Sequence, residues 1–470
     1  MGVASGRTGL MGARDHGRGM PKQASKCKRR PATFAAVARG HLDRQPPSPA
    51  ARVAAVAIVV AAAACASRCA PIVPDANQLG VSEVVTTLET CPSAAKALSR
   101  VETIVSGLDV PWDVAFLADG RALITERPGR IRVVESNGSL RPEPWASIPV
   151  YGPAGAEIGL LGIDTRSGTD GETEVYVTAT VQSTTTNPAT RFLARVGRWI
   201  ARVYDPERGH ATTLQVIAFN DRAGRGVNPR VVVDGLPSAY LHGGGGLRFG
   251  PDGLLYTANG DGAEPPRAQL DSSRRGKILR YAVDGSVPGA SPMPASPLFA
   301  RGVRHVQGLD WLSTGELLAI DHGPTGLPAE NHRTGRDELN AVATVGANLG
   351  WPVVTGATTG GPFVSPLVTW TPAIAPAGLA VYRGVSAAWS GSVFVAGLKG
   401  GLRRVVLDRG PAGMVARCED VVLNTTYGRL RLVRNAPDGT LWVGTSNRDG
   451  RGRPRANDDR ILRITPPDLP

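Results

Sequence analysis

Residues 247–260 read LRFGPDGLLYTANG, which is an apolar strand, an Asp-Gly turn and a second strand of alternating apolar residues. Glycine accepts a positive φ without steric cost, so the Asp-Gly pair favours a tight β-hairpin. The same pattern recurs outward along the chain in both directions. The other copies are DVAFLADGRALITE (113–126), DGETEVYVTA (170–179), LDWLSTGELLAID (309–321), AAWSGSVFVAG (387–397) and LVRNAPDGTLWVGTS (432–446). The sequence therefore contains six copies of one hairpin unit.

A short strand follows each hairpin and completes the repeated unit. No long amphipathic helix separates the strands, which excludes a βαβ architecture. A β-sandwich does not easily accommodate six equivalent units, whereas a radial arrangement of four-stranded sheets does. The sequence therefore predicts an all-β fold, a six-bladed β-propeller. The closing strands are expected at 129–134, 198–205, 276–283, 337–343, 401–408 and 459–466.

The composition of the 470-residue chain agrees with a large folded body. Hydrophobic residues make up 42% of it and charged residues 20%, which excludes disorder and a small disulfide scaffold for most of the chain. The formal net charge is +13, but residues 1–52 hold eleven Lys or Arg against two Asp. The basic charge is mostly that of an N-terminal arm, so we expect no nucleic-acid partner for the folded body.

The basic arm leads into an expected export signal. After Arg52, residues 53–64 read VAAVAIVVAAAA, an apolar run that would rise only about 18 Å as a helix. Such a run is too short to span a bilayer and is typical of a signal peptide. Small residues then lead to Cys65, which resembles the lipid-attachment cysteine of bacterial lipoproteins. Lipid anchoring in the cell envelope and ordinary cleavage between Ala64 and Ala70 with secretion both remain open.

The domain organisation follows from these features. The chain has five cysteines, and no spacing between them matches a zinc site. Cys91 and Cys418 lie in the expected exported body, where they can form a disulfide, with Cys69 as a competing partner for either. The expected parts are a basic arm with the export segment (1–70), a lead-in segment (71–100) and the propeller (101–470).

Long insertions mark the expected functional site, because propeller loops converge on the central channel. Three stand out, at 222–246, 284–307 and 321–340. His242 lies near the end of the first insertion, before four glycines that let a ligand approach closely. A histidine in this position suits a general base. A loop histidine held by a structural hydrogen bond is the alternative.

Four cations fall at comparable positions relative to different hairpins: Arg304, Lys399, Arg429 and Arg431. If they converge on one channel, they form a cationic cluster with few acids nearby, which requires an anionic ligand. A ligand with several carboxylates is the natural partner, because arginine binds carboxylate in a bidentate fork. Solvated cations that face outward are the alternative.

The segments DHGP (321–324) and DELN (337–340) combine a tight turn with adjacent carboxylates. Hard cations such as Ca²⁺ prefer six to eight oxygen ligands, drawn from carboxylates and backbone carbonyls. The two segments are therefore a candidate calcium site. Capping of a turn by Asp337 is the alternative.

Together these segments resemble the soluble PQQ-dependent sugar dehydrogenases, the aldose and glucose dehydrogenases with six-bladed propellers. The likeness extends from about Val101 to Pro466 and is carried by several motifs in the same order. They are PWDVAFLADGRALITERPGRI (111–131), GLLGI (159–163), HGGGGLRFGPDGLLYTANGD (242–261), RHVQGLDW (304–311), DHGP (321–324), DELN (337–340), NLGWP (348–352), GRLRLV (428–433), NAPDG (435–439) and NRDG (447–450).

The resemblance implies an exported quinoprotein that oxidises an aldose at C1 to a lactone, with hydride transfer to PQQ. It implies that His242 takes the proton of the anomeric hydroxyl, and that the four cations bind PQQ together with Gln307. It also implies Ca²⁺ as a second cofactor, and an electron acceptor that remains unidentified. The implied calcium ligands are Gly323, Pro324 and Leu349 through their carbonyls, and Glu338 through its carboxylate.

Some positions depart from the family pattern. His305 stands where the family has Asn, and Glu157 stands where some members have a Gln that contacts the cofactor, so both are expected at the PQQ site. Gly246 replaces a usual Arg, Leu349 replaces the Tyr of NYGWP, and Leu432 replaces an Asp. Three of these changes touch the cofactor site.

Three functions remain in competition. The first is the PQQ-dependent sugar dehydrogenase. The second is a propeller lactonase, which would hold a divalent metal on the axis in a cage of carboxylate and Asn ligands and would have no use for four convergent cations. The third is a decayed propeller that acts as a non-enzymatic binding protein of the envelope, for which the departures at His305, Gly246 and Glu157 are the evidence.

Overall fold

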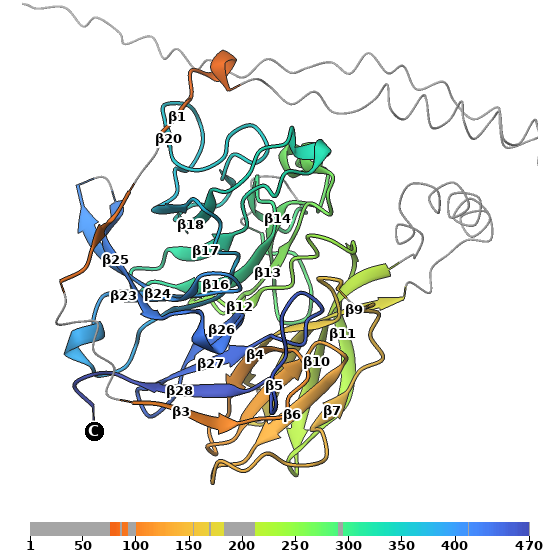
Figure 1. Cartoon of the computed structure of the whole chain (residues 1–470). Coiled ribbons are helices and arrows are strands. Elements are labelled where there is room, and N and C mark those ends of the chain that lie inside the picture. The colour runs from red at the N-terminus through yellow and green to blue at the C-terminus, as the bar shows by residue number, and fades with distance from the viewer. Residues whose placement is uncertain are drawn as a thin grey trace, which may run out of the picture. The chain divides into compact units, whose positions relative to one another are not determined.

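Twenty-four of the strands form six four-stranded sheets arranged radially, as a six-bladed β-propeller (Figure 1). The computed structural model describes residues 76–84, 87–92, 100–153, 155–168, 171–182, 212–289, 295–411 and 413–469. Among these residues, no helix is long and apolar enough to cross a membrane. The export segment and Cys65 lie outside the described residues.

The first three blades follow the chain in order. Blade one contains β4 (Pro111–Phe116), β5 (Ala122–Glu126), β6 (Arg130–Val134) and β7 (Ala146–Ser147). Blade two contains β8 (Leu160–Ser167), β9 (Thr173–Gln182), β10 (Thr212–Arg222) and β11 (Arg225–Pro237). Blade three contains β12 (Leu247–Phe249), β13 (Leu255–Asn259), β14 (Lys277–Tyr281) and β15 (Leu298–Arg301), extended by β19 (Ala347–Asn348).

The last three blades also recruit strands from elsewhere in the chain. Blade four contains β16 (Val306–Trp311), β17 (Leu317–Asp321), β18 (Asp337–Val342) and β21 (Val368–Trp370). Blade five contains β22 (Pro376–Val381), β23 (Ser392–Gly397), β24 (Gly401–Gly410) and β25 (Gly413–Leu423), extended by β2 (Glu89–Thr90). Blade six contains β26 (Leu430–Asn435), β27 (Leu441–Thr445), β28 (Ile461–Thr465) and β3 (Arg100–Val105).

Short elements complete the described fold. The lead-in segment adds a two-stranded sheet of β1 (Ser82–Glu83) and β20 (Thr358–Thr359). The 3₁₀ helices are η1 (Asn77–Leu79), η3 (Pro265–Gln269), η4 (Pro328–Glu330), η5 (Ala387–Trp389) and η6 (Thr425–Tyr427). Each has only three to five residues, so none forms a layer of the fold.

The predicted propeller is confirmed, with its six hairpins, but two details differ. The closing strand expected at 198–205 lies outside the described residues, and β10 pairs with β9 as the third strand of blade two. The stretch 222–246, expected as a loop insertion, is mostly strand β11, so that expectation was wrong for its first half.

The ring closes through the N-terminal part of the chain. The innermost strands β4, β8, β12, β16, β22 and β26 each contact the next, and β26 contacts β4. Strand β3 comes from the N-terminal side and pairs antiparallel with β28, with Val105 opposite Ile461. The last blade is therefore built from both ends of the propeller, which holds the ring closed.

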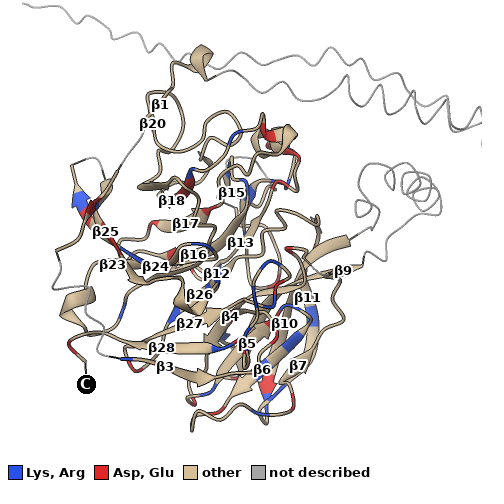
Figure 2. Cartoon of the chain, viewed as in Figure 1, with Lys and Arg blue, Asp and Glu red and all other residues tan. Residues whose placement is uncertain are grey.

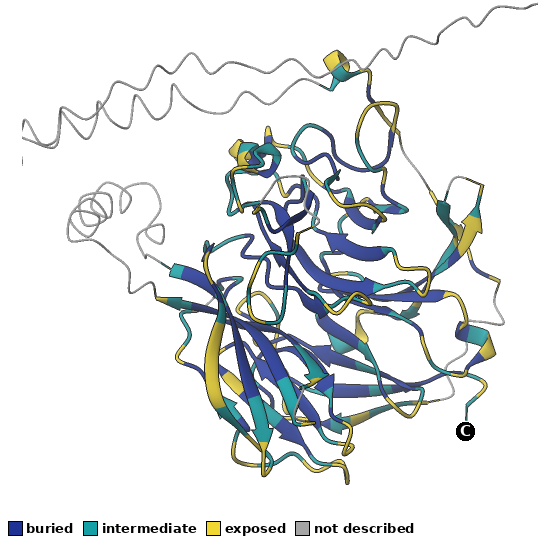
Figure 3. Ribbon diagram, turned by 180° about the vertical axis from the view of Figure 1, so that it is seen from behind, coloured by how far each residue is buried: buried dark blue, intermediate teal, exposed yellow. Residues whose placement is uncertain are grey.

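Apolar side chains fill the spaces between neighbouring blades. Leu123, Ile131, Leu160 and Val177 of blades one and two are fully buried in one such cluster. The inner strands are accordingly buried on both faces, while exposure rises toward the outer strands (Figure 3). Each blade thus depends on its neighbours to cover its faces, as radial repetition requires.

A ring of charges lies on the inner strands or directly after them, with one residue from each blade. Asp113 is bound by Arg248 at 2.9 Å and Arg434 at 3.0 Å, and Asp310 is bound by Arg383 at 2.8 Å. The aspartates also accept backbone N–H bonds from the next blade, as Asp164 does from Phe249 at 2.8 Å. These bonds fix the order and register of the blades. The six members of this charge ring are Asp113, Asp164, Arg248, Asp310, Arg383 and Arg434.

The lead-in segment is fastened to two blades. A disulfide joins Cys91 to Cys418 on β25, so this pairing exists, while Cys69 lies outside the described residues. Farther toward the N-terminus, Glu83 forms an ion pair with Arg336 and accepts a hydrogen bond from the Thr355 backbone at 2.9 Å. A cross-link between residues so distant in sequence restricts the unfolded chain strongly.

Candidate functional site

Loops from all six blades surround a pocket of about 330 Å³. All the residues predicted at the PQQ site line it, so the structure brings this part of the prediction together. The two later insertions contribute as expected, through 304–307 and 322–327. The predicted residues in the pocket are Glu157, His242, Arg304, His305, Gln307, Lys399, Arg429 and Arg431.

His242 reaches the pocket from the segment between β11 and β12. Its backbone is left-handed, with φ of 54°, and its side chain is buried. Gly260, after β13, lies directly against it, because a Cβ at Gly260 would come within 1.9 Å of the His242 carbonyl oxygen. Only glycine allows this approach, which brings the end of β13 and the following Asp261 to the imidazole.

Asp261 is a positioning residue for His242. One carboxylate oxygen lies 2.7 Å from Nδ1 of His242, and the other accepts a hydrogen bond from the Trp351 indole at 2.8 Å. Burial works to raise the pKa of Asp261, but the hydrogen bond from His242 helps to hold it below its usual value. An ionised Asp261 keeps the proton on Nδ1, so Nε2 of His242 carries a lone pair that can accept a proton.

Glu157 connects three groups at the side of the pocket. It accepts a hydrogen bond from the His242 backbone at 2.7 Å, lies 3.3 Å from Nε2 of His305 and forms an ion pair with Arg451 at 2.6 Å. Burial acts to raise the pKa of Glu157, but the Arg451 guanidinium and the hydrogen bond from the His242 backbone hold it below its usual range. Glu157 is therefore a fixed negative charge that aligns the backbone of His242.

His305 is a neutral imidazole. Burial lowers the pKa of His305 to about 3 despite the nearby Glu157. Its Nδ1 accepts a hydrogen bond from the Gly244 backbone at 3.2 Å, and its Nε2 lies 2.6 Å from the amide nitrogen of Gln307. His305 thus occupies the pocket wall without adding positive charge to it.

The expected cluster of cations with few acids nearby needs correction. The buried Arg304 forms an ion pair with Glu330 at 2.5 Å. Arg429 and Arg431, which lie in one blade and not in two, share Asp449 at 2.8 and 3.0 Å. Glu330 and Asp449 are distant in sequence from Arg304 and Arg429, and only the tertiary fold brings them together.

The remaining cations of the pocket differ in their partners. Arg431 lies 4.2 Å above the ring of Trp112, and burial lowers its pKa to about 10, so it stays charged at neutral pH. Lys399 is exposed at the rim, and its side chain contacts no acid among the described residues. Arg127 and Arg451 also line the pocket and were not anticipated. Six cations therefore face two lining carboxylates, Glu157 and Asp449.

The predicted calcium residues lie beside the pocket and do not line it. The Pro324 carbonyl accepts a hydrogen bond from Gly335 at 3.0 Å, and Leu349 packs in the core between blades three and four. Glu338, on β18, accepts hydrogen bonds from the Gly356 backbone at 2.6 Å and from Asn340 at 3.0 Å. In the described parts of the chain, no three His, Cys, Asp or Glu side chains converge as metal ligands do.

Buried carboxylates are nevertheless concentrated in this region. Burial raises the pKa of Glu338 to about 7, and burial together with Glu338 raises that of the neighbouring Asp321 to about 8. Burial also raises the pKa of Asp337. Asp337 does hold a turn, because it accepts hydrogen bonds from the backbones of Gly323 and Ile374 at 2.8 and 2.7 Å. Oxygen ligands with uncompensated charge are the chemistry that a hard cation requires.

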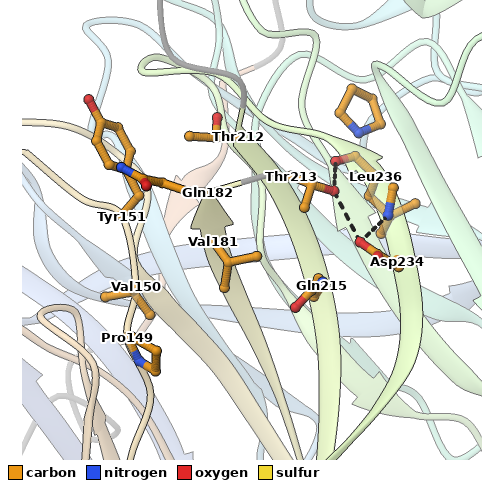
Figure 4. Close-up of a pocket in the computed structure, with 12 residues that line it drawn as sticks. Pro149, Val150, Tyr151, Val181, Gln182, Thr212, Thr213, Gln215, Asp234 and Leu236 are labelled. Carbon is orange, nitrogen blue, oxygen red and sulfur yellow. Dashed lines mark hydrogen bonds between the residues drawn. The ribbon is translucent and has the colours of Figure 1, made fainter. Parts of the chain in front are cut away.

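A larger cavity of about 660 Å³ lies on blade two, away from these residues (Figure 4). Among the described residues that line it, Asp234 is the only charged one. Thr213 donates a hydrogen bond to the Leu236 carbonyl at 3.1 Å, and Asp234 accepts one from the Gly235 backbone at 2.6 Å. The part of its lining that the structure describes contains no histidine or cation, unlike the pocket around His242.

Comparison with known proteins relates the chain to sugar dehydrogenases. The chain is 26% identical to the aldose sugar dehydrogenase YliI of Escherichia coli, over 76% of this chain and 92% of that protein. It is similar to the PQQ-bound aldose sugar dehydrogenase of Streptomyces coelicolor, with 30% identity, a TM-score of 0.62 and coverage of 78% and 97%.

A third likeness is to a putative oxidoreductase (glucose dehydrogenase) of Thermus thermophilus. The identity is 37%, the TM-score is 0.65, and the match covers 78% of this chain and 99% of that one. The family described as Glucose / Sorbosone dehydrogenase matches residues 108–462, which is nearly the whole propeller. The chain therefore belongs to the Glucose / Sorbosone dehydrogenase family.

Proposed function

We propose that this protein is an exported PQQ-dependent dehydrogenase that oxidises an aldose at C1 to the lactone. The observation that carries the proposal is the pairing of His242 with Asp261 at 2.7 Å in a pocket lined by excess positive charge. The pairing supplies a base with a defined lone pair, and the charge supplies a binding site for an anionic cofactor.

The charge of the pocket fits PQQ, which carries three carboxylates. Among the lining residues, six cations oppose Glu157 and Asp449, and Glu330 behind Arg304 is a third acid. Asp261 beside His242 is a fourth acid, and positive charge still remains in excess, which suits a cofactor with three carboxylates. Lys399, which has no acidic partner among the described residues, and the pair Arg429 and Arg431, which share one carboxylate, would hold its carboxylates.

Each pocket residue has a distinct role in the proposed reaction. When bound, PQQ supplies the quinone that accepts the hydride from C1 of the sugar. His242 takes the proton of the anomeric hydroxyl at Nε2, and Asp261 holds the imidazole in the required tautomer and stabilises its charged form. Glu157 fixes the backbone of His242. His305 and Gln307 form part of the wall of the same pocket.

Calcium is part of this proposal. Glu338, together with the carbonyls of Gly323, Pro324 and Leu349, would hold Ca²⁺ beside the pocket. The support is that the buried carboxylates Asp321, Asp337 and Glu338 form no ion pair among the described residues. There the ion would compensate buried negative charge and stiffen the DHGP turn that carries pocket residue His322.

The proposal is tested by the thermal stability of the protein. We expect Ca²⁺ and PQQ together to raise Tm, because a ligand that binds only the folded state stabilises it by about 2.7 kcal/mol at a hundredfold excess over Kd. Differential scanning fluorimetry with each ligand alone and with both gives the measurement. A panel of aldoses with a reducible dye then tests turnover. The absence of any shift in Tm would favour a non-enzymatic binding protein of the envelope.

Export is also part of the proposal. The disulfide between Cys91 and Cys418 supports an oxidising compartment. We expect protein isolated from its native envelope to lack residues 1–52, because their charge and the apolar run after them fit a cleaved signal. Intact-mass spectrometry measures this, and an added diacylglycerol on Cys65 would identify the lipid-anchored form. Recovery of a species that retains the basic arm would contradict the prediction.

A further inference from the structure

An arginine-rich loop stands at the mouth of the pocket. It connects β27 to β28, and residues 446–457 read SNRDGRGRPRAN. Two of its residues, Asp449 and Arg451, line the pocket. We call residues 446–457 the arginine loop. Figure 2 shows lysine and arginine in blue on the described blades.

The acids of this part of the chain face inward and hold the loop backbone. Asp449 is buried and accepts a hydrogen bond from the backbone of Arg451 at 2.9 Å. Asp458 and Asp459, just after the loop, are also buried. Asp458 accepts from the Arg455 backbone at 2.8 Å, and Asp459 from the Asn447 backbone at 2.5 Å. Inward carboxylates thus fix the shape of the loop.

The arginines of the loop face outward. Arg448, Arg451, Arg453 and Arg455 are all exposed. Nε of Arg448 donates to the Asp458 carbonyl at 2.6 Å, and Nη1 of Arg455 donates to the Thr426 carbonyl at 2.9 Å. A carbonyl orients a guanidinium without cancelling its charge. Three of the four outward arginines therefore keep a full positive charge toward solvent.

The individual partners show which of these charges are free. Arg451 forms an ion pair with Glu157 at 2.6 Å, and so links the loop to the segment between β7 and β8. Arg453 has no ion pair or hydrogen bond to another side chain in the described regions. Exposed Lys399 adds a further cation to the rim. The described rim residues Thr325 and Leu327 across the pocket are uncharged.

These charges lie beyond those that the proposed cofactor neutralises. An anionic cofactor in the pocket would be held by the cations that line it. Arg448, Arg453 and Arg455 do not line the pocket, so their charges persist when it is filled. The mouth of the pocket therefore remains positive on one side when the proposed cofactor, which must be reoxidised after each turnover, is bound.

We propose that the arginine loop is the docking surface for an acidic one-electron carrier protein that accepts the electrons of the reaction. This inference rests on the proposed function. Oxidation of one aldose to its lactone releases two electrons and two protons. The protons leave to solvent through the pocket, and the electrons pass to two carrier molecules, each reduced by one electron.

Simple electrostatics explains why such a carrier suits this surface. Opposite charge on two partners steers their encounter and raises the association rate, with a strong dependence on ionic strength. Electron-transfer encounters use small, transient interfaces, so a single charged loop is large enough to guide one. Docking at the loop would bring the carrier to the opening of the pocket.

The test compares acceptors of opposite charge on the full chain loaded with Ca²⁺ and PQQ. The small acceptors are ferricyanide and a trimethylammonium ferrocenium, and the protein acceptors are an acidic plastocyanin and a basic cytochrome c. All four take one electron. The test variant is Arg453→Glu with Arg455→Glu. Its matched control is Arg409→Glu with Arg417→Glu, two exposed arginines on the outer hairpin of blade five.

At low salt we expect the test variant to lower the second-order rate constants for ferricyanide and plastocyanin about tenfold, and to raise those for the cationic acceptors. The control should change all four by less than about twofold, and 0.5 M salt should remove the difference. Equal effects in the two variants would overturn the proposal. An effect on ferricyanide but none on plastocyanin would also overturn it, because the loop would then attract only small anions.

A binding measurement keeps this test separate from that of the proposed function. The anisotropy of fluorescently labelled plastocyanin at low salt reports docking without any sugar. We expect binding to the wild type and to the control, and at least tenfold weaker binding to the test variant. If no aldose is oxidised with any acceptor but this binding pattern holds, the proposed function fails and the docking surface stands. Equal binding to all three proteins refutes the docking surface.

Discussion

Asp113→Ala is expected to lower the free energy of unfolding by about 3–5 kcal/mol, the usual cost of removing one partner from a buried ion pair. Asp113 is almost fully buried at the propeller axis, where it holds Arg248 at 2.9 Å and Arg434 at 3.0 Å. It also accepts a hydrogen bond from the Ile163 backbone of the next blade at 3.3 Å. The substitution leaves two arginines without their carboxylate and breaks a link between blades.

Urea unfolding followed by tryptophan fluorescence measures this loss. Asp113→Asn is the second variant, because it keeps the shape and the acceptor oxygen and removes only the charge, so we expect an intermediate loss. The matched control is Asp408→Ala, which breaks the ion pair with Arg417 between two exposed side chains. It should barely move the midpoint, since exposed pairs contribute little. Equal midpoints for Asp113→Ala and the control would show that the charge ring does not stabilise the propeller.

The pH dependence of this effect has a defined sign. Burial alone would raise the pKa of Asp113, but Arg248 and Arg434 hold it below the ordinary value of 3.8. The contribution of Asp113 to stability is therefore complete above that value and is lost as the pH falls through the lower pKa of the folded protein. The stability difference between the wild type and Asp113→Asn should be constant near neutral pH and shrink only in strong acid.

The hairpins of the propeller are predictable because their signals are local. Asp252-Gly253 and its counterparts at 119–120 and 438–439 define tight turns between strands that alternate in polarity. Strand β3 has no such signal, because its partner β28 lies at the other end of the propeller. The same holds for the charge ring, whose members are far apart in sequence and meet only when the ring closes.

In the pocket too, residues within local sequence motifs are predictable, whereas their partners from distant parts of the sequence are not. Residues in motifs, such as His242 before its four glycines, can be picked out of the sequence, and the structure places His242 in the pocket. Their partners were missed, because Asp449 and Glu330 reach the arginines only through the folding of loops. Asp261 is a partial exception, since it directly follows the TANG segment (257–260) that ends a predicted hairpin. An acid at the end of such a strand was a usable signal.

His242→Ala is expected to lower kcat for aldose oxidation by about 10²–10⁴-fold, or roughly 3–5.5 kcal/mol in the barrier. The reason is that Nε2 of His242 is the proposed acceptor of the anomeric proton. The affinity for PQQ should change little, because the cations that hold the cofactor remain in place. Stopped-flow dye reduction at saturating sugar gives kcat, and titration of the protein with PQQ gives Kd.

Replacement of a cation of the pocket should instead lower the affinity for PQQ more than it lowers kcat. Lys399→Ala or Arg429→Ala is expected to weaken PQQ binding, while turnover per bound cofactor changes less. Asp261→Asn should fall between the two classes, with a smaller loss of kcat than His242→Ala, because it disturbs the imidazole without removing it. The two classes of variant thus separate chemistry from cofactor binding. If His242→Ala oxidises every aldose substrate of the wild type at a near wild-type rate, His242 is not the general base.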